Sequence, residues 1–478
     1  MKRMIGIGLT ILAPLSVGVA RAQQAELPAD VRDAIETRVT HGYNAGMIVG
    51  IIGPEGVRYR AFGHMRLPDG PAPDERTVFE IGSITKVFTA LLLADMAGTG
   101  EVRLSDAIGE YLPEEVEPPE RNGRRITLLD LATHTSALPR VPGNMLPVDP
   151  ANPYARYTPQ LLYAFLSVYQ PSRDVGSSYE YSNLGYGLLG HVLARRAGTD
   201  YGQLVVERIA EPLGLEDTRA EPTDSMRDRL ARGYSGGIEV PPWDVPDPFA
   251  GAGALLSTAA DMSRFVAANM GLIDLLLRSP ADSTRRSAMD STLRSAMDST
   301  LRSAMDATQR PRVPTDSPNM SVGLGWHISE GEGGTVIWHN GGTGGYRSFI
   351  GFTADKTTGV VVLSNSNESV DDIGFHLLDP SRPLREVRIP VEVSEATLQR
   401  YVGRYELRPG FVIQIRLRDG LLTAQASGQP ELRLFPTSST RFFLAVVDAE
   451  IEFPADGGEE VSELILHQNG EQRARRIE

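Results

Sequence analysis

The sequence predicts an α+β fold, and the position of strand-like and helix-like segments supports this prediction. Apolar residues alternate near both ends of the first 380 residues, whereas the middle of that segment shows helical spacing and helix stops. This order favours one antiparallel sheet built from both ends of the domain, flanked by helices, with a helical subdomain inserted. After residue 391 alternation continues without long helical runs, which predicts a separate small all-β domain.

The elements of the first domain are expected in a definite order. A helix at 27–41 precedes two strands within 44–64, which meet at a Gly-Pro-Glu-Gly turn. Helices follow at 83–97, 127–135, 159–169, 183–197, 201–213 and 258–270. Strands then follow at 322–329, 335–340, 346–353 and 358–364, and a helix at 371–378 ends the domain.

An octapeptide repeats three times in tandem at 283–306, as STRRSAMD, STLRSAMD and STLRSAMD. Asp and Arg recur four residues apart, as do Leu and Met, so a helix would carry a charge ladder and an apolar stripe. Because three units are few for a solenoid, we expect an insertion that forms a surface helix or a flexible loop. A role in binding is the alternative.

The chain start has the features of a secretory signal at 1–22. Lys2 and Arg3 precede an apolar stretch that ends in Ala20-Arg21-Ala22, a small-x-small cleavage pattern. We therefore expect a secreted or periplasmic protein, with no membrane contact after cleavage. The predicted domains are 23–380, which includes the repeat, and 391–478, joined by a Pro-rich linker at 381–390.

The amino-acid composition excludes some kinds of catalysis and argues against some partners. The chain contains no cysteine, which excludes thiol catalysis and disulfides, and its formal net charge of −14 argues against nucleic acid as a partner. Only three of its 47 basic residues are lysines, namely Lys2, Lys86 and Lys356. Lys86 stands inside an apolar helical run, where arginine could not deprotonate but a desolvated lysine can.

The stretch GSITK supplies a candidate nucleophile and its base. Ser83 and Lys86 lie three residues apart, so a helix places them side by side. A serine needs a base to attack a carbonyl, and burial would lower the pKa of the lysine toward neutrality. The alternative is a helix-capping serine with a lysine that reaches to solvent.

Two further motifs have the residue types of an active site. Tyr181-Ser182-Asn183 joins a phenol and an amide just before a predicted helix, although an aromatic turn with a capping Asn would look the same. In WHNGGTGG, His339 ends a strand and is followed by Gly341 and Gly342, whose backbone amides can approach a substrate closely. A glycine-rich hairpin is the alternative here.

The three motifs together resemble the penicillin-recognising serine hydrolases, most closely the class C β-lactamases and their esterase and D-amino-acid peptidase relatives. ITLLDLATHTSALP at 126–139 and GAGALLSTAADMSRF at 251–265 extend the resemblance. It implies the family's sheet with an all-helical subdomain, and the C-terminal part is similar to a small β-barrel domain appended to some members.

The resemblance also implies roles for the motif residues. Ser83 would form an acyl-enzyme, with the general-base work shared by Lys86 and Tyr181. Asn183 would orient the amide carbonyl of the substrate, and the backbone amides of Ser83 and Gly342 would form the oxyanion hole. His339 stands where the family usually has the lysine that faces the substrate carboxylate, so carboxylate recognition should be weaker or depend on pH near ~6.5.

The sequence leaves the substrate open. The main hypothesis is a hydrolase of β-lactams or related amides, and the alternatives are a carboxylesterase, a D-Ala-D-Ala carboxypeptidase or D-aminopeptidase, and a penicillin-binding or sensor protein that acylates without turnover. The expected partner is a small molecule or a cell-wall peptide. No metal or cofactor is expected, and a monomer is predicted.

Overall fold

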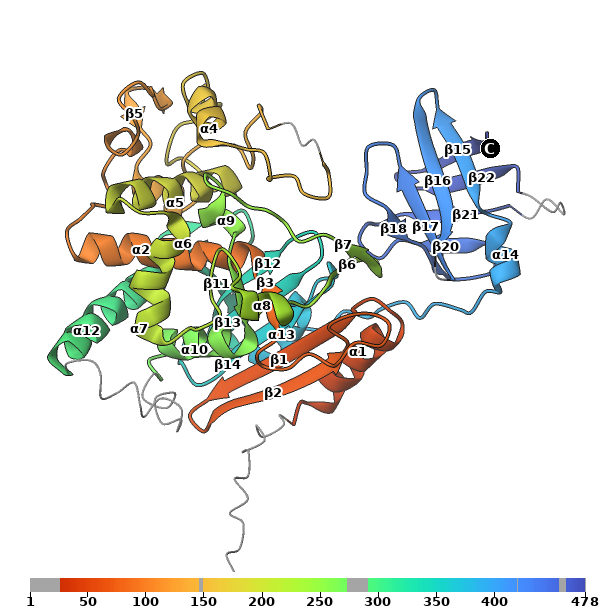
Figure 1. Cartoon of the computed structure of the whole chain (residues 1–478), viewed down its shortest axis with the longest axis horizontal. Helices are drawn as coiled ribbons and strands as arrows, with labels where there is room; N and C mark the ends of the chain where they lie inside the picture. Colours follow the sequence, from red (N-terminus) through yellow and green to blue (C-terminus); the bar gives the residue numbers. More distant parts are fainter. Residues whose placement is uncertain (1–25, 146–148, 273–290, 419, 455–460, 478) are drawn as a thin grey trace, which may run out of the picture.

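The chain folds into a larger mixed domain and a smaller β domain joined by an extended segment (Figure 1). The computed structural model describes residues 26–145, 149–272, 291–418, 420–454 and 461–477. The predicted signal at 1–22 lies outside these ranges. The α+β fold with an added all-β domain is confirmed.

The larger domain is built on an antiparallel sheet in the order β2-β1-β14-β13-β12-β11-β10-β9 within the described ranges. Its strands are β1 (Gly46–Gly53), β2 (Gly56–Gly63), β9 (Val313–Pro314), β10 (Met320–Val322), β11 (His327–Gly331), β12 (Gly334–Gly342), β13 (Arg347–Thr353) and β14 (Gly359–Ser364). The pairing of β1 with β14 joins the two ends of the domain, as predicted.

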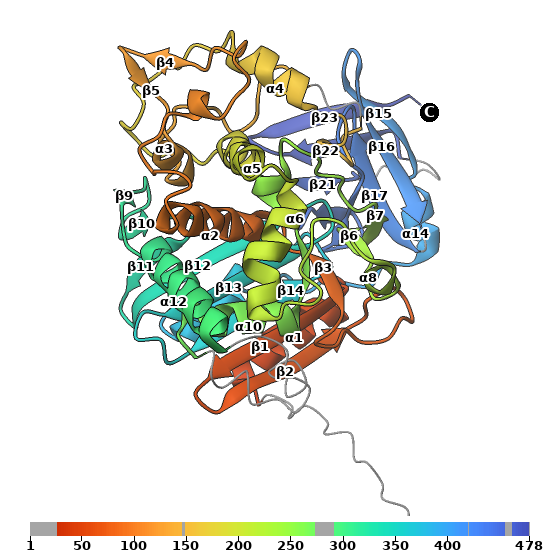
Figure 2. The same ribbon diagram turned by 60° about the vertical axis from the view of Figure 1, so that its left-hand side comes forward.

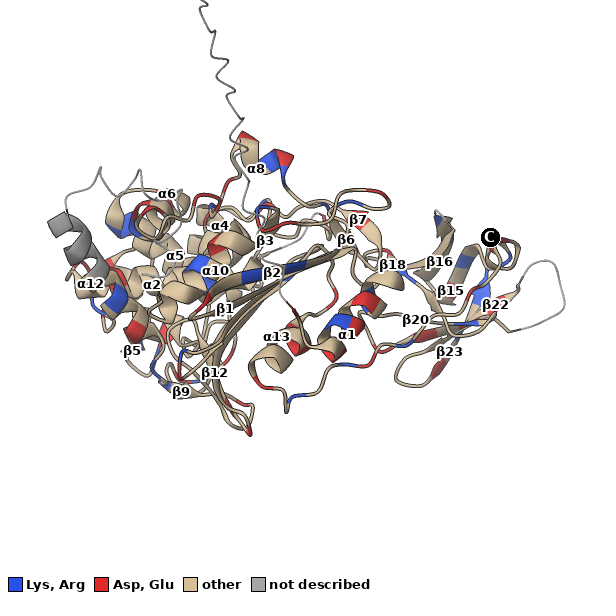
Figure 3. Cartoon of the chain, turned by 90° about the horizontal axis from the view of Figure 1, so that it is seen from below, with Lys and Arg blue, Asp and Glu red and all other residues tan. Residues whose placement is uncertain are grey.

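Helices cover both faces of this sheet, which Figure 3 shows nearly edge-on. Helices α1 (Ala29–Thr40) and α13 (Asp371–Leu378) pack on one face, with Val31 and Ile373 in the same apolar cluster as Val49 and Val362 of the sheet. On the other face, residues of α2 (Thr85–Gly98) and α10 (Ala259–Asn269) belong to the same apolar cluster as Ile48 of β1. The alternating direction of strand side chains explains the two cores.

Helix α2 lies at the centre of the domain, between the sheet and the helical subdomain (Figure 2). Nearly all of its side chains are buried, which explains a sequence that is apolar on every side.

The subdomain and its connections contain α3 (Leu128–Ala132), α4 (Pro159–Leu166), α5 (Asn183–Ala197), α6 (Tyr201–Val205), α7 (Glu211–Leu213), α8 (Asp224–Asp228) and α9 (Ala250–Gly253). Short elements complete the domain: β3 (Val78–Glu80), β4 (Glu120–Arg121), β5 (Arg124–Arg125), β6 (Gly233–Ser235), β7 (Ile238–Val240), β8 (Leu256–Thr258), the 3₁₀ turns η1 (Gly82–Ile84) and η2 (Ile108–Glu110), and the π-helical η3 (Val206–Ala210).

The predicted helices and strands of this domain are confirmed, with one error at 322–329. That range is the end of β10, a tight turn and β11 instead of one strand. The turn contains Gly325 at φ +76°, where a Cβ would come within 2.9 Å of the Lys86 carbonyl oxygen. The close approach to α2 therefore requires glycine and breaks the strand, which the alternating pattern alone did not indicate.

The later part of the octapeptide repeat is helical. Helix α12 (Ser291–Thr308) contains the described repeat residues, and 283–290 lie outside the described ranges. Leu301 and Met305 of the expected apolar stripe are buried in the main core, and α12 packs along α2. The helix is thus part of the domain's packing rather than a loop.

The C-terminal domain is a near-barrel of nine described strands with α14 (Glu395–Gln399) beside it. The strands are β15 (Gly403–Arg408), β16 (Phe411–Arg418), β17 (Leu421–Ala426), β18 (Leu432–Arg433), β19 (Phe435–Pro436), β20 (Arg441–Phe443), β21 (Glu450–Glu452), β22 (Glu463–His467) and β23 (Glu471–Arg476). The two edge strands, β18 and β19, follow one another in the chain, so the sheet curls almost closed around its own apolar core.

Tyr43 links the two domains. Its ring stacks on Phe435 at 4.9 Å, and its hydroxyl donates to the carbonyl of Arg388 in the connecting segment at 2.6 Å. Arg433 of the small domain donates to the carbonyl of Gly42 at 3.3 Å.

In the part of the chain that the structure describes, no helix has the length and apolar character needed to cross a bilayer.

Candidate active site

Ser83 lies in the short 3₁₀ turn η1 that leads into α2, rather than in the first α-helical turn. The turn is fixed by its neighbours: the carbonyl of Ile81 accepts the Ser348 hydroxyl of β13 at 2.9 Å, and Thr85 accepts the amide of Leu255 at 3.1 Å. Ser83 is only partly buried, so its hydroxyl sits at the opening of a rigid, buried helix.

Lys86 lies fully buried beside Ser83. Its Nζ atom is 2.9 Å from the Ser83 Oγ and 2.7 Å from the carbonyl oxygen of Ala252. Among the described residues no carboxylate pairs with it. Burial, with a smaller contribution from the charge of Arg140, lowers the pKa of Lys86 well below its ordinary value. A neutral amine that donates one N–H to Ala252 can direct its lone pair at the Ser83 hydroxyl.

Tyr181 completes this group. Its ring lies 4.9 Å from the Lys86 Nζ atom, and its phenol is within hydrogen-bonding reach of Ser83. Burial raises the pKa of Tyr181 to about 12, so the phenol keeps its proton at neutral pH. The group can therefore donate or relay a proton, whereas Lys86 is the better base.

His134 positions the Tyr181 segment. The two rings stack at 4.5 Å, and the backbone amide of Ser182 donates to His134 Nδ1 at 3.0 Å. Burial, assisted by nearby Lys86, lowers the pKa of His134 well below its usual value, so Nδ1 stays free to accept. His134 adopts φ +59°, which folds its loop back toward Tyr181.

Asn183 begins α5, with Ser182 as its N-cap. Its Nδ2 atom donates to the Tyr154 hydroxyl at 3.1 Å, whereas its Oδ1 atom is buried without a hydrogen-bond partner in the described part of the chain. A buried acceptor without a partner costs free energy, so this atom suits a ligand donor. Tyr154 was not predicted, because nothing in its loop sequence indicates that it reaches the site.

The strand β12 brings glycine backbone against the turn that holds Ser83. Gly82 adopts φ +50°, and a Cβ there would lie 2.7 Å from the amide nitrogen of Gly342. A Cβ on Gly341 would lie 2.0 Å from the carbonyl oxygen of Ile81. Only glycine fits this approach, which brings the amide of Gly342 next to the turn of Ser83. The backbone amides of Ser83 and Gly342 can serve as an oxyanion hole.

His339 is placed near this group but is only 1% exposed. Its Nδ1–H donates to the carbonyl of Asn340 at 2.6 Å, and the ring of His327 lies 4.9 Å away. Burial, followed by the proximity of His327 and Lys86, lowers the pKa of His339 well below 6.5. A buried histidine with a lowered pKa stays neutral near pH 6.5, which argues against the change in carboxylate affinity expected there from the sequence.

A small cavity of about 30 Å³ lies beside Ser83. Its walls combine the predicted Ser83, Asn183 and Gly342 with aromatic side chains that sequence reasoning missed, namely Tyr154, Trp243 and Phe249. Tyr154 packs edge-on to Trp243 at 5.5 Å. The site thus offers an apolar wall on one side of the nucleophile and hydrogen-bonding groups on the other.

Glu80 lies behind the Trp243 wall. Its Oε1 atom accepts the backbone amide of Trp243 at 2.8 Å, and its side chain is almost fully buried. Burial raises the pKa of Glu80 to about 7. This carboxyl was also missed, although it stands three residues before Ser83 in the sequence.

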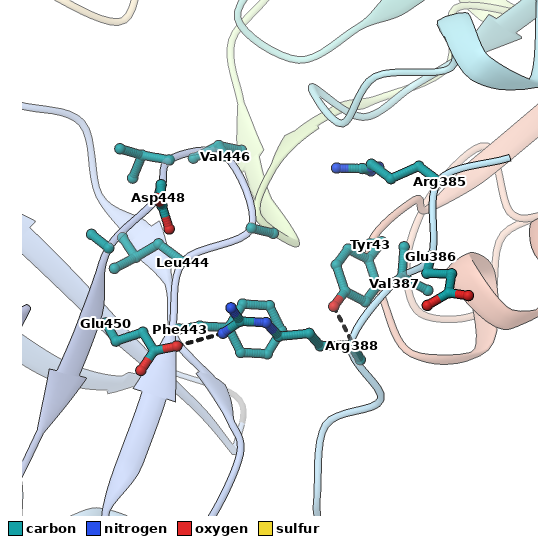
Figure 4. A pocket seen from close by; sticks show the side chains of 13 residues that line it. Tyr43, Arg385, Glu386, Val387, Arg388, Phe443, Leu444, Val446, Asp448 and Glu450 are labelled. Atoms are coloured by element: carbon teal, nitrogen blue, oxygen red, sulfur yellow. Dashed lines mark hydrogen bonds and ion pairs between the residues drawn. The ribbon is translucent and has the colours of Figure 1, made fainter. Parts of the chain in front are cut away.

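A second cavity, of about 320 Å³, lies between the domains (Figure 4). Both arginines that line it form ion pairs: Arg388 binds Glu450 at 2.5 Å, and Arg385 binds Glu368 at 2.9 Å. Because these two pairs join the connecting segment to the larger domain and to the small domain, the cavity has the character of a domain junction. Within the described ranges, no group of three or more His, Asp or Glu side chains is arranged to hold a metal ion.

Comparison with known proteins agrees with this geometry. A family model described as Beta-lactamase matches residues 31–376, and a second, described as a domain of unknown function (DUF3471), matches residues 387–476. The D-alanyl-D-alanine-carboxypeptidase/endopeptidase AmpH of Escherichia coli (strain K12) is 30% identical over 372 residues, which cover 76% of this chain and 91% of that protein.

Two further relatives extend the likeness. Penicillin-binding protein 4* of Bacillus subtilis (strain 168) is 24% identical over 461 residues, covering 90% of this chain and 94% of that protein, so the match includes the C-terminal domain. A solved class C β-lactamase mutant superposes with a TM-score of 0.61 at 21% identity, covering 75% of this chain and 99% of that structure. The chain belongs to the β-lactamase family and has the fold of the class C β-lactamases and AmpH.

Proposed function

We propose that this protein is a serine hydrolase that cleaves β-lactam or related amide bonds through an acyl-enzyme on Ser83. The observation that carries the proposal is the 2.9 Å contact between the Ser83 Oγ atom and a fully buried Lys86 without a carboxylate partner in the described residues. A serine beside an amine whose pKa is lowered by burial has the activation that nucleophilic attack requires.

The residues divide the reaction between them. Lys86 takes the proton of Ser83 as the hydroxyl attacks the carbonyl carbon, and the amides of Ser83 and Gly342 stabilise the oxyanion. When the C–N bond breaks, the Tyr181 phenol donates its proton to the leaving nitrogen and regains one from Lys86. Water then attacks the ester while Lys86 accepts its proton, and Lys86 returns that proton to the Ser83 oxygen as the ester C–O bond breaks.

Asn183 and the aromatic wall orient the substrate. The unpartnered Oδ1 atom of Asn183 suits an amide N–H of the acyl part, and Tyr154, Trp243 and Phe249 suit its apolar surface. The resemblance had suggested contact of Asn183 with the amide carbonyl. Both contacts are available, since Nδ2 has a second hydrogen beside the one given to Tyr154.

The proposal is tested by rates on nitrocefin, a D-Ala-D-Ala peptide and a short-chain p-nitrophenyl ester, with Ser83→Ala as the control. Turnover of the β-lactam or the peptide that is lost in Ser83→Ala supports it. Turnover of the ester alone would identify a carboxylesterase instead, and activity that survives Ser83→Ala would overturn the nucleophile.

The second candidate is a penicillin-binding protein that acylates and stalls. It is favoured by the likeness to penicillin-binding protein 4*, which spans both domains of this chain. Mass spectrometry with a penicillin distinguishes the two: a persistent adduct on the Ser83 peptide indicates a binding protein, whereas free penicilloate indicates a hydrolase.

The proposed location is outside the cytoplasm, as a secreted or periplasmic monomer. Lys2 and Arg3, the apolar stretch and Ala20-Arg21-Ala22 support export, and a cell-wall peptide is a substrate of that compartment. N-terminal sequencing of the protein from the periplasm or medium should begin at Gln23; material that keeps Met1 would contradict the cleavage.

A further inference from the structure

The backbone of Arg140 is hydrogen-bonded to the segment that supplies Asn183. Its carbonyl oxygen accepts the amides of Asn183 at 3.0 Å and Leu184 at 3.1 Å. These are amides at the start of α5 that lack partners within the helix. The backbone of Arg140 is therefore fixed against the segment that supplies Tyr181 and Asn183.

The guanidinium of Arg140 faces the catalytic group from solvent. The residue is exposed, and its Cζ atom lies 5.1 Å from the centre of the Tyr181 ring, whose phenol reaches Ser83. No carboxylate among the described residues forms an ion pair with it. Its charge is close enough to act on both Lys86 and Tyr154.

The other basic side chains nearby are unsuited to binding an anion. Neutral His339 is buried and gives its Nδ1 proton to Asn340. Lys86 is occupied by Ser83 and Ala252. Arg347 donates to the carbonyls of Thr343 and Tyr346, each at 3.3 Å.

We infer that Arg140 binds the carboxylate of the substrate, the task that the lysine of the third motif is expected to perform in relatives. The inference rests on the proposed function, because β-lactams and D-Ala-D-Ala peptides both carry a carboxylate close to the scissile amide. An arginine beside Tyr181 is placed to hold such a group while Ser83 attacks. Arg140 thus determines specificity for acidic over uncharged substrates.

Binding measurements separate this role from catalysis. Calorimetric affinities are compared for an acyl-D-Ala-D-Ala peptide and its C-terminal amide, with Ser83→Ala as the background that cannot react. We expect the acid to bind about tenfold more tightly than the amide, as a hydrogen-bonded charge pair provides. Arg140→Gln on that background should remove this preference, and Arg140→Lys should keep much of it.

A matched control removes the same charge elsewhere. Arg103 is exposed and follows the far end of α2, so Ser83→Ala with Arg103→Gln should keep the acid preference. An equal loss of acid and amide binding in Arg140→Gln would overturn the inference and leave Arg140 with a role in positioning Tyr181. Equal affinities of the Ser83→Ala protein for the peptide acid and for its C-terminal amide would also overturn the inference. The proposed function is judged separately, by Ser83-dependent turnover of the unmodified enzyme.

Discussion

The two domains differ in where their charged and titratable side chains lie. Around Ser83, Lys86, His134, His339 and Glu80 are buried, and burial is the main cause that displaces the pKa of each. In the C-terminal domain, many charged side chains on the strand faces pair with one another, as Arg418 does with Glu431 at 2.9 Å. Figure 3 shows the charged residues along these strands.

This difference in burial indicates which domain contains the candidate catalytic site. Burying a charged group without a partner costs free energy, and such groups are concentrated where a protein needs a shifted pKa. Surface ion pairs contribute little and perturb no reacting group. The comparison therefore locates the candidate catalytic groups in the larger domain, and substitutions in each domain can test this division.

Lys86→Arg should reduce acylation of Ser83 by about 10³-fold, because arginine keeps the charge but cannot act as a base. The measurement is the acylation rate with nitrocefin or the peptide, with Ser83→Ala as the lower limit. Circular dichroism should first show that the variant is folded, since the site is fully buried. A near-normal rate in folded Lys86→Arg would assign the base elsewhere.

The sequence predicted that Lys86 lies beside Ser83, but it did not predict which other groups contact the lysine. The three-residue spacing placed it beside Ser83, and the scarcity of lysine marked it as unusual. The Ala252 carbonyl that orients its amine comes from a segment 166 residues away, and no local pattern encodes that contact. Arg140 was missed for the same reason, since its approach depends on how the His134 loop folds back onto Tyr181.

The fold was predicted well where periodicity decides structure and poorly where contacts between distant segments do. Alternation and helical spacing identified β1, β14, α5 and most other elements of the larger domain. The break at Gly325 was missed because it is imposed by the nearby backbone of Lys86. The burial of His339 was missed because it arises from neighbouring elements, including His327 on the adjacent strand.

Glu80→Gln should stabilise the protein by about 2 kcal/mol above neutral pH and have little effect under acidic conditions. Burial raises the pKa of Glu80 from 4.5 to about 7. Below 4.5 the group is protonated in both folded and unfolded states. As the pH rises toward 7, only the unfolded state ionises readily, so the wild type loses stability that the neutral glutamine retains.

The measurement for Glu80 is the Tm of both proteins across this pH range. Asp106→Asn offers a control, because Asp106 is a partly exposed carboxylate that bonds Tyr111 well away from Trp243. A Glu80→Gln protein that is less stable than the wild type at alkaline pH would show that the charged carboxylate is needed for structure.

His339→Gln should leave the pH dependence of carboxylate binding almost unchanged near ~6.5, the ordinary pKa of histidine. The reason is that burial keeps His339 neutral there, with its Nδ1–H on the Asn340 carbonyl. The measurement is the affinity of the Ser83→Ala protein for the acidic peptide as a function of pH. If the affinity of the Ser83→Ala protein rises as the pH falls through ~6.5, and this rise disappears when His339→Gln is added, the pH dependence expected from the sequence is correct.

Arg418→Gln in the C-terminal domain should have the smallest effect, less than about 1 kcal/mol on stability and none on the rate. Although partial burial acts to raise the pKa of Glu431, hydrogen bonds from Thr423 and Arg418 outweigh it and lower that pKa. Thr423 and Arg416 remain beside Glu431 when Arg418 is replaced. The measurement is Tm together with kcat/KM. A marked fall in kcat/KM with an unchanged Tm would mean that this domain takes part in substrate binding, and the division of charge between the domains would then no longer locate function.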